Sequence, residues 1–396
     1  GKEERAMSIP EAIYTSSETA KTLIFKQYPS IRVNDILFEH LVFIRFPGCK
    51  TMTTQEPIQF KGAPGSPYTR KMLAVLRYRQ IPYQLILGTG LLDGKSELPQ
   101  AKVKLAPTFY FRDEKGDYEA VVDSTPIIRR LEDEYAGRSV IPNEPITRFL
   151  DYLLEDFADE WLTKAMFHYR WYYEADIKKA GEILPRWTNL TATEEDMESM
   201  SEFVRDRQIN RLYVVGSNDT TAPVIEESYQ RILKLMASHM NTSPYMFGHR
   251  PAASDFGLYG QLTQLAVFDP TPMRIADEIA SRVVAWVGTV DDLSGHPSLD
   301  DQWNSFAQLG DSLKDIFREV GKVYVPALLA NAEALESGAQ TVKLEIDGKE
   351  WVQEPFPYQA KCLQWLRQEF VRLEDNERKL VLDFLDGTGC HSLFQK

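Results

Sequence analysis

The sequence predicts an α/β domain at residues 57–136, an all-helical domain at residues 146–338, and a small C-terminal addition of a hairpin and helices at residues 339–396. Three observations carry this prediction. Strand and helix patterns alternate in the first segment, helical patterns alone fill the second, and a hairpin signal opens the third. A chain of 396 residues is also too long for one ordinary core, which favours several packed units.

Residues 1–56 differ from the rest of the chain. They show no clear hydrophobic period, their polarity is mixed, and Met52 stands where a natural chain could start. We therefore expect an extension that is disordered, with an artefact of the gene sequence as the alternative.

Residues 57–136 alternate between strand and helix patterns. The expected order is strand, helix, strand, two-stranded hairpin and helix, at residues 57–61, 67–79, 81–87, 107–111, 118–122 and 124–135. Apolar side chains recur on one face of each helix, and a polar turn joins the hairpin strands. A strand–helix–strand unit followed by a hairpin and a helix is the thioredoxin-like arrangement, so we predict this fold for the first domain.

Helical patterns alone follow a linker at residues 136–145, which contains one Gly and two Pro. Helices are expected at residues 146–174, 192–209, 222–241, 254–265, 272–293 and 307–337. Pro326 should break or kink the last of them. In the tail, Asp347-Gly348 between two alternating segments indicates a hairpin. Two helices are expected after it, at residues 357–374 and 376–385.

The composition argues against several classes of partner. The net charge of −13 disfavours nucleic acid or an anionic membrane as a bulk partner. We expect neither a signal peptide nor a membrane span, because no apolar run reaches the ~18 residues that a spanning helix needs. The cysteines, Cys49, Cys362 and Cys390, are too few for a disulfide framework, which favours a reducing, intracellular setting. The six histidines lack ligand spacing, so we expect no metal.

The motif Gly65-Ser66-Pro67-Tyr68 marks the start of the first expected helix. Ser66 suits the N-cap and Pro67 the first helical position. Unpaired N–H groups and the helix dipole favour negative charge at such a place, so a thiolate held there would be stabilised. Taken alone, Ser66 is more simply an N-cap.

The motif Leu105-Ala106-Pro107-Thr108 precedes an expected strand. In thioredoxin-like folds the corresponding proline is cis, and it exposes the backbone N–H and C=O of the preceding residue to an extended peptide ligand. A trans proline that opens a strand is the ordinary alternative, because cis bonds make up only about 5–6% of X–Pro bonds in folded proteins.

The pair Asp123-Ser124 begins the last helix of the first domain. Ser124 offers a hydroxyl and a backbone N–H to a carboxylate, and the helix dipole helps. Asp123 can accept a hydrogen bond from an ammonium group. By itself the pair is an ordinary helix cap, but all three motifs fall in consistent places relative to the same strands and helices.

Together the three motifs resemble those of the glutathione S-transferase family, over about residues 58–293. Ser66-Pro67-Tyr68 is similar to the family's catalytic-helix motif. The resemblance implies that Ser66 activates glutathione, with Tyr68 as a less suitable substitute because it lies two residues inside the helix. Ala106-Pro107 is similar to the dipeptide that grips the cysteinyl backbone, and Asp123-Ser124 to the pair that binds the γ-glutamyl end.

The second domain carries a further resemblance and a departure. Residues 248–255 resemble the family's helix-capping element, but Ala252 stands where the family has Ser or Thr, while Asp255 is kept. Because loss of a cap costs ~1 kcal/mol, this departure puts the local stability in doubt.

The first helix of the second domain is rich in aromatic residues. In the family this helix lines the cosubstrate site and the dimer interface, so the resemblance implies that Trp161, Phe167 and Tyr169 line a cosubstrate pocket; core packing is the alternative. His168 on the same helix is expected to be structural. The acidic residues of this helix are predicted to form a solvated face: Glu155, Asp156, Asp159 and Glu160.

The resemblance implies a cytoplasmic, homodimeric glutathione transferase that acts in detoxification. Its glutathione thiolate would attack a small electrophile, or would cleave a halide or an ether. Glutathione is then the cosubstrate, and no metal, nucleic acid or membrane is involved. The shape of the electrophile is not encoded in any periodicity of the sequence.

Two alternatives stay open. A binding or scaffold protein on the same fold would need no turnover, and the C-terminal addition, which has no assigned chemistry, could serve it. A thiol–disulfide enzyme is disfavoured, because Ser66 stands where such a member would have Cys.

Overall fold

The computed structural model describes residues 56–89, 97–299 and 302–395. The extension expected at residues 1–56 lies outside this part of the chain, apart from Glu56, and so does Cys49.

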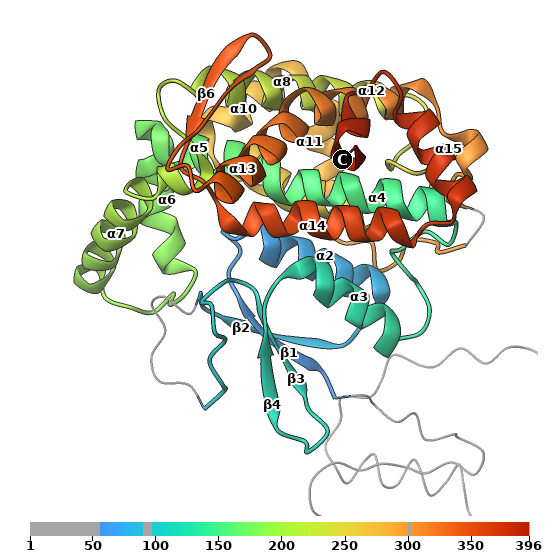
Figure 1. The fold of residues 1–396 in the computed structure, drawn as a ribbon. Coiled ribbons are helices and arrows are strands. Elements are labelled where there is room, and N and C mark those ends of the chain that lie inside the picture. The colour runs from blue at the N-terminus through green and yellow to red at the C-terminus, as the bar shows by residue number, and fades with distance from the viewer. Residues whose placement is uncertain (1–55, 90–96, 300–301, 396) are drawn as a thin grey trace, which may run out of the picture. The chain divides into compact units, whose positions relative to one another are not determined.

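The first domain has the predicted thioredoxin-like arrangement (Figure 1). Its elements are β1 (Ile58–Gly62), α2 (Pro67–Arg79), β2 (Tyr83–Leu87), β3 (Thr108–Arg112), β4 (Tyr118–Val121) and α3 (Ser124–Glu134). The sheet order is β2-β1-β3-β4, with β2 parallel to β1 and the other neighbours antiparallel. Helices α2 and α3 lie on the side of the sheet that faces the helical domain.

Local sequence explains these elements. Phe60 of β1 pairs in register with Phe109 of β3, and their rings stack with centroids 4.7 Å apart in the core. Helix α2 begins as expected, with Ser66 accepting from the Thr69 N–H at 3.2 Å and Pro67 in the first turn. It ends where Gln80 adopts a left-handed conformation with φ of 56°.

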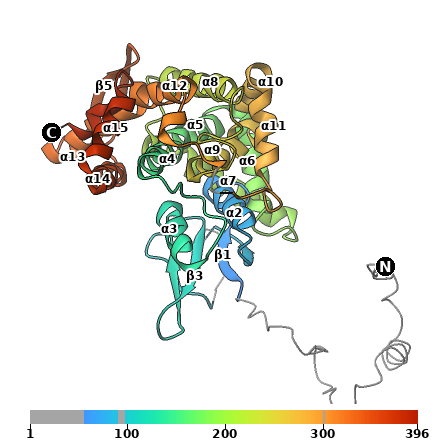
Figure 2. The ribbon, with the colours of Figure 1, turned by 90° about the vertical axis from the view of Figure 1, so that its right-hand side faces the viewer.

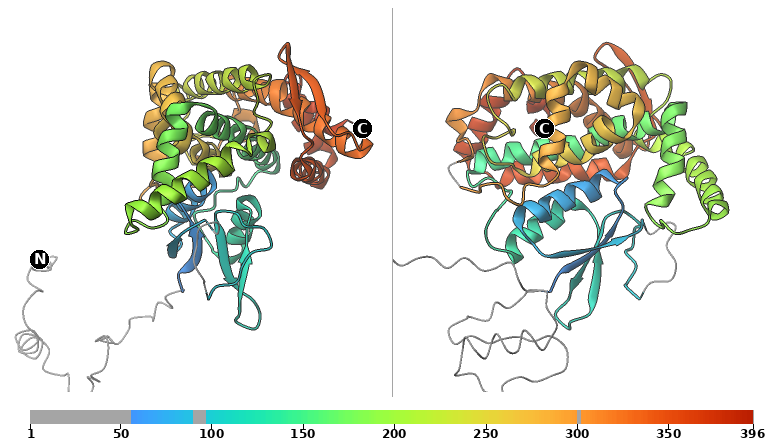
Figure 3. Two further views of the ribbon diagram at one scale, coloured as in Figure 1. Left: turned by 90° about the vertical axis from the view of Figure 1, so that its left-hand side faces the viewer. Right: turned by 180° about the vertical axis from the view of Figure 1, so that it is seen from behind.

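The elements of the second domain are helices in the described residues, as predicted. Its α-helices are α4 (Pro145–Phe157), α5 (Thr163–Tyr172), α6 (Glu174–Arg186), α7 (Glu194–Ile209), α8 (Ala222–His239), α9 (Ala253–Thr263), α10 (Pro270–Ile279), α11 (Ser281–Val290), α12 (Asp311–Glu319) and α13 (Val325–Ser337). Shorter helical turns are η2 (Ala158–Leu162), η3 (Leu212–Val215), η4 (Gln264–Phe268), η6 (Phe306–Gln308) and η7 (Val320–Tyr324). Helices α6 and α7 stand at one end of the domain (Figure 3).

The helix boundaries differ from the expectation in the first part of the domain and at Ala280, whereas the break near Pro326 was expected. The long helix expected at residues 146–174 is interrupted by the π-turn η2, and helix α6 was not predicted. The helix expected at 272–293 is split at Ala280, whose φ is −152°. Ahead of Pro326 the last helix is interrupted by the π-turn η7, consistent with the expected break.

The C-terminal addition consists of β5 (Val342–Ile346), β6 (Lys349–Gln353), α14 (Pro357–Arg372), α15 (Asp375–Leu385) and η8 (Cys390–Phe394). The predicted hairpin is present, and Asp347 and Gly348 both have positive φ, as its tight turn requires. The addition lies beside α4, while α10 and α11 lie on the far side of the helical domain (Figure 2).

One continuous apolar core joins the three segments. It runs from Phe60 in the sheet through Phe256 in α9 to Trp351 and Leu385 in the addition. The backbone of η7 also packs directly against the segment between α15 and η8. A Cβ added at Gly321 of η7 would lie only 1.9 Å from the Thr388 carbonyl oxygen. The addition is therefore an integral part of the folded unit.

Candidate functional site

The first two sequence motifs meet at the N-terminus of α2. The Ser66 hydroxyl donates to the Ala106 carbonyl oxygen at 3.0 Å while it accepts from the Thr69 N–H. The Ala106–Pro107 peptide bond is cis, as thioredoxin-like folds lead one to expect. A hydroxyl at a helix N-terminus therefore stands directly beside the backbone of the cis-proline turn.

Two buried side chains of the helical domain hold the loop that carries Ser66. Arg170 donates to the Gly65 carbonyl at 2.8 Å, and Gln264 donates to the Pro64 carbonyl at 3.0 Å. Arg170 is itself held by a buried ion pair with Asp269, at 2.9 Å. Because the loop carbonyls are fixed by a buried guanidinium and amide, the position of Ser66 is set from both domains.

The third motif lies at the start of α3. Asp123 has φ of 83°, an uncommon value for a residue with a side chain. One oxygen of its carboxylate accepts from the Thr125 N–H at 3.3 Å, and the other accepts from the Tyr358 hydroxyl at 2.7 Å. Within the described part of the chain, no Lys or Arg forms an ion pair with Asp123. Its carboxylate is therefore not paired with a cation from those residues.

Lys71 lies beneath Ser124 and was missed by the sequence analysis. Its ammonium donates to the Ser124 hydroxyl at 3.0 Å, to Glu155 at 2.8 Å and to Asp159. Since this ammonium has three protons, all of them are used. The Ser124 oxygen accepts one of these bonds, which leaves its own proton to donate elsewhere.

The buried charges around Lys71 compensate one another, because cations and carboxylates lie in direct contact. Burial lowers the pKa of Lys71, but the carboxylates of Asp159 and Glu155 outweigh burial and raise it. Burial likewise raises the pKa of Glu155, but Arg129 and Lys71 lower it to about 2. Lys71 is therefore cationic and Glu155 anionic at neutral pH.

The acidic residues of the first long helix are not a solvated face, so that prediction was wrong. Glu155, Asp159 and Glu160 are at most 8% exposed, and Asp156 is half-buried. Burial raises the pKa of Glu160 to about 8 and that of Asp156 to about 7, in both cases with help from neighbouring carboxylates. The charge run is covered by α2 on one side and by the C-terminal addition on the other.

Tyr68 is placed apart from the cis-proline turn. Its hydroxyl donates to the Asp159 carbonyl at 2.7 Å. Burial and the charges of Glu160 and Asp159 raise its pKa well above the ordinary value, so the phenol stays protonated. The structure brings Ser66 to Ala106, and leaves Tyr68 bonded to the helical domain.

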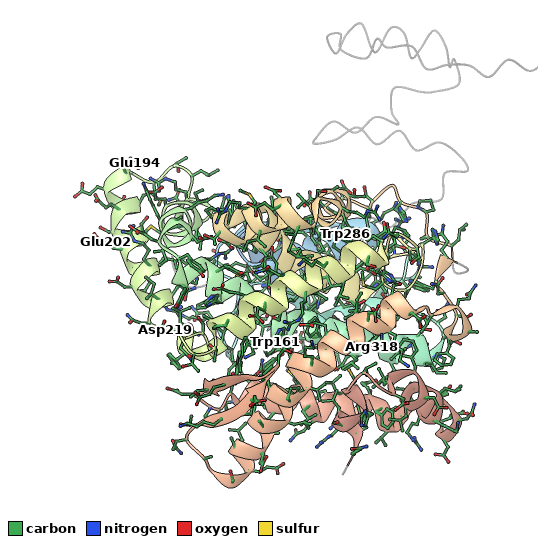
Figure 4. The ribbon with its side chains drawn as sticks, turned by 90° about the horizontal axis from the view of Figure 1, so that it is seen from above. Trp161, Glu194, Glu202, Asp219, Trp286 and Arg318 are labelled. Atoms are coloured by element: carbon green, nitrogen blue, oxygen red, sulfur yellow. The ribbon has the colours of Figure 1, made fainter. Side chains whose placement is uncertain are left out.

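The three aromatic residues expected at a cosubstrate pocket lie in different surroundings. Trp161 and Tyr169 are each 1% exposed, and Trp161 lies in the interior (Figure 4). Trp161 donates to Ser228 and packs against Trp351. Phe167 is half-buried and packs on a small apolar cluster formed by α5, α6, α7 and η4. Leu184 and Trp187 belong to this cluster, and both would meet a Cβ added at Gly65. Phe167 is thus the one of the three whose cluster adjoins the Ser66 loop.

His168 is structural, as expected. It is fully buried, with one ring nitrogen 2.8 Å from the Ser217 hydroxyl and the other 3.1 Å from Glu226. No group of metal-ligating side chains was found among the described residues. None of the helices in the same residues is long and apolar enough to cross a membrane.

Local patterns hold little signal for these missed residues. Lys71 sits on an otherwise amphipathic helix, where a lysine is ordinarily exposed. Tyr358 lies 235 positions from Asp123, and only the docking of α14 brings the two together. Arg170 was one of many charged residues on an aromatic-rich helix. In each case the role of the residue depends on a partner that is distant in the sequence.

The comparisons agree with the motifs of the first domain. Residues 61–139 match the family model for the glutathione S-transferase N-terminal domain. The resemblance found in the sequence is therefore confirmed for this part of the chain. A search of curated proteins found no match.

Solved structures give matches at low identity. A glutathione S-transferase from Methylobacterium radiotolerans, in complex with glutathione sulfonate, is 16% identical over 63% of this chain and 95% of its own, with a TM-score of 0.36. A family member from Pseudomonas fluorescens with two glutathione molecules bound is 14% identical over 61% and 95%, with a TM-score of 0.39. A Tau class enzyme from mango is 16% identical over 66% and 100%, with a TM-score of 0.36.

Proposed function

Because residues 61–139 match the family model for the glutathione S-transferase N-terminal domain, we propose that the protein is a glutathione transferase-like enzyme. It conjugates the glutathione thiolate to an electrophilic small molecule. The observation that carries the proposal is the 3.0 Å contact between the Ser66 hydroxyl and the Ala106 carbonyl. A cysteinyl residue held by the Ala106 backbone would have its sulfur beside Ser66 at the N-terminus of α2.

Each motif then has a role toward the tripeptide. The backbone of Ala106, shaped by Pro107, pairs with the cysteinyl backbone. The Ser66 hydroxyl turns from the Ala106 carbonyl toward the sulfur and donates to it. The helix N-terminus and this donor favour the thiolate over the thiol, and the thiolate is the nucleophile.

The γ-glutamyl end is held by charge. The α-carboxylate accepts from Ser124, whose hydroxyl proton is left free because its oxygen already accepts from Lys71. The α-ammonium binds Asp123, whose charge no cation of the described residues matches. A zwitterionic ligand end therefore meets one donor and one anion at the start of α3.

The chemical step forms one carbon–sulfur bond. The thiolate attacks an electrophilic carbon, and either a leaving group departs with the bonding electrons or an activated double bond takes up the pair. The thiol proton has already passed to solvent when the thiolate forms. Cleavage of a carbon–halide or an ether bond is the same displacement with a different leaving group. We place this activity in cytoplasmic detoxification by a homodimer.

The experiment that tests the proposal is glutathione binding by titration calorimetry. The wild-type protein should bind in the micromolar-to-millimolar range, and the double variant Asp123→Ala, Ser124→Ala should not. Absence of wild-type binding at millimolar glutathione would sink the proposal.

Substitution of Ser66 tests the chemistry. In Ser66→Ala the bound thiolate loses one donor, and hydrogen bonds to charged groups are worth roughly 1.5–3 kcal/mol, so we expect kcat to fall about tenfold to a hundredfold. The thiol pKa of bound glutathione should rise, which ultraviolet absorbance of the thiolate measures against pH. Binding of glutathione should be nearly unchanged. Full activity in this variant would instead favour the binding or scaffold alternative.

A further inference from the structure

We propose that the C-terminal addition completes the glutathione site, with Tyr358 as a positioning residue for the carboxylate of Asp123. This inference rests on the proposed function. It assigns a role to a segment that carries none of the sequence motifs, and it makes the site incomplete without residues 339–396.

The contact itself joins two distant parts of the chain. Tyr358 is the second residue of α14, and its hydroxyl donates to one carboxylate oxygen of Asp123 at 2.7 Å. The other oxygen accepts from the Thr125 N–H at 3.3 Å. Asp123 holds an uncommon backbone conformation, with φ of 83°. Such conformations persist where the surroundings fix the residue, and Tyr358 supplies one of the two bonds to its side chain.

The start of α14 is anchored rather than free to swing. The buried Asn331 clamps Phe356, because its side chain accepts from the Phe356 N–H at 2.7 Å and donates to the Phe356 carbonyl at 2.9 Å. On the other side, the buried Gln359 donates to the Glu160 carbonyl at 3.1 Å. Tyr358 lies between these two anchors. Its position is thus preorganised, which favours a fixed wall of the site over a lid.

The tyrosine orients Asp123 without cancelling its charge. Burial, followed by the charges of Asp123 and Glu160, raises the pKa of Tyr358 far above its ordinary value. The phenol is therefore a neutral donor at every pH at which the protein would be assayed. A carboxylate offers about four lone-pair positions, and two are used here, so room remains for an incoming ammonium.

The consequence is a selection rule for the ligand. Because two hydrogen bonds hold the Asp123 carboxylate in place, ligands with a free α-ammonium at the γ-glutamyl end should be preferred over ligands without it. Tyr358 acts only through Asp123, so it should matter only for ligands that carry the ammonium group. A merely structural tyrosine would affect both kinds of ligand alike.

The test compares glutathione with its deamino analogue, glutaryl-cysteinyl-glycine, by titration calorimetry on the full chain. The variants are Tyr358→Phe and Asp123→Asn. The matched control is Tyr172→Phe, which removes another tyrosine–carboxylate bond of 2.7 Å, to Asp219, on the helical domain. Thermal unfolding of each variant shows that the fold is kept.

We expect Tyr358→Phe to weaken glutathione binding about tenfold and to leave analogue binding within about twofold of wild type. Asp123→Asn should remove the preference for glutathione, and Tyr172→Phe should change neither ligand. Unchanged or tighter glutathione binding by Tyr358→Phe overturns the inference, as does an equal loss for both ligands, while the proposed function stands. Absence of wild-type glutathione binding withdraws both.

Discussion

At the residue scale, Lys71 links the fold to the candidate site. Its side chain is 1% exposed and bonds both the buried Ser124 at the start of α3 and Glu155 in the interior. A buried charge is tolerated because it is paired and fully hydrogen-bonded. The same ammonium that neutralises the buried carboxylates also sets the direction in which the Ser124 hydroxyl can donate. Stability and ligand binding are thus coupled through one side chain.

Removal of the Lys71 charge should be costly. In Lys71→Met, Glu155 and Asp159 lose their shared partner, and breaking a buried ion pair from one side costs about 3–5 kcal/mol of unfolding free energy. Urea denaturation measures the loss. The control is Lys379→Met, which removes an exposed pair with Asp383 and should leave stability unchanged within error. A loss under about 1 kcal/mol for Lys71→Met would show that its charge is not needed to balance the core.

At the element scale, α9 is the helix on which the first domain docks. Its start lacks the capping side chain, since Ala252 occupies that place, yet its N–H groups are satisfied. Asp151 of α4 accepts from the Ser254 N–H at 2.9 Å, and Asp255 accepts from the Ala252 N–H at 2.9 Å. The local weakness expected from the sequence is therefore compensated by a carboxylate from another helix.

The contact between α2 and α9 depends on Gly260. A Cβ at this position would lie 2.5 Å from the Pro67 carbonyl oxygen, in the first turn of the helix that Ser66 caps. We expect Gly260→Ala to displace α2, to lower the unfolding free energy by about 1–3 kcal/mol, and to weaken glutathione binding. Denaturation and calorimetry measure the two effects.

The control for that substitution is Gly288→Ala in α11. Apart from the neighbouring residues and the backbone of α11 itself, no heavy atom lies within 4 Å of a Cβ built there. Alanine should therefore stabilise this helix by about 0.4–1 kcal/mol, through the unfolded chain and the helix propensity. If Gly260→Ala behaved like Gly288→Ala, the close approach of α2 would not limit the site.

At the scale of the whole molecule, a buried polar layer joins the helical domain to the C-terminal addition. We use this name for Glu160 with Gln359, and Lys164 with Gln353, whose side chains meet at 3.3 Å and 3.4 Å. Burial raises the pKa of Glu160 to about 8, whereas that of Lys164 is lowered to about 8. Both shifts favour the neutral forms, as a low-dielectric interface requires.

The layer makes stability depend on pH. Glu160 binds its proton more tightly in the folded protein than in the unfolded chain, where its pKa is near 4.5. The stability that this supplies is complete below about pH 4.5 and is lost as the pH rises through about 8. In Glu160→Gln the side chain stays neutral, so the variant should gain stability over wild type as the pH rises.

Urea denaturation between about pH 5 and about pH 9 measures this difference. The control is Glu198→Gln on α7, at an exposed position, which should follow wild type throughout. If the difference between Glu160→Gln and wild type were constant over this range, Glu160 would not titrate in the folded protein.

The sequence by itself determined the order of the elements and the places of the motifs. Ser66 and Asp123 can be recognised as helix caps, and Pro107 as a proline that opens a strand. Like the hairpin turn at Asp347-Gly348, these are short-range features. Their physical causes lie within a few residues of the chain. The fold class followed from the alternation of these signals, and it is confirmed.

Only the tertiary structure decided which charges are buried and which partners they have. The run from Glu155 to Glu160 has a pattern typical of a solvated face, and it became interior because α2 and α14 cover it. The pairing of Tyr358 with Asp123 has the same cause. The free energy of a buried charge depends on partners that arrive from distant segments, and no local pattern encodes them.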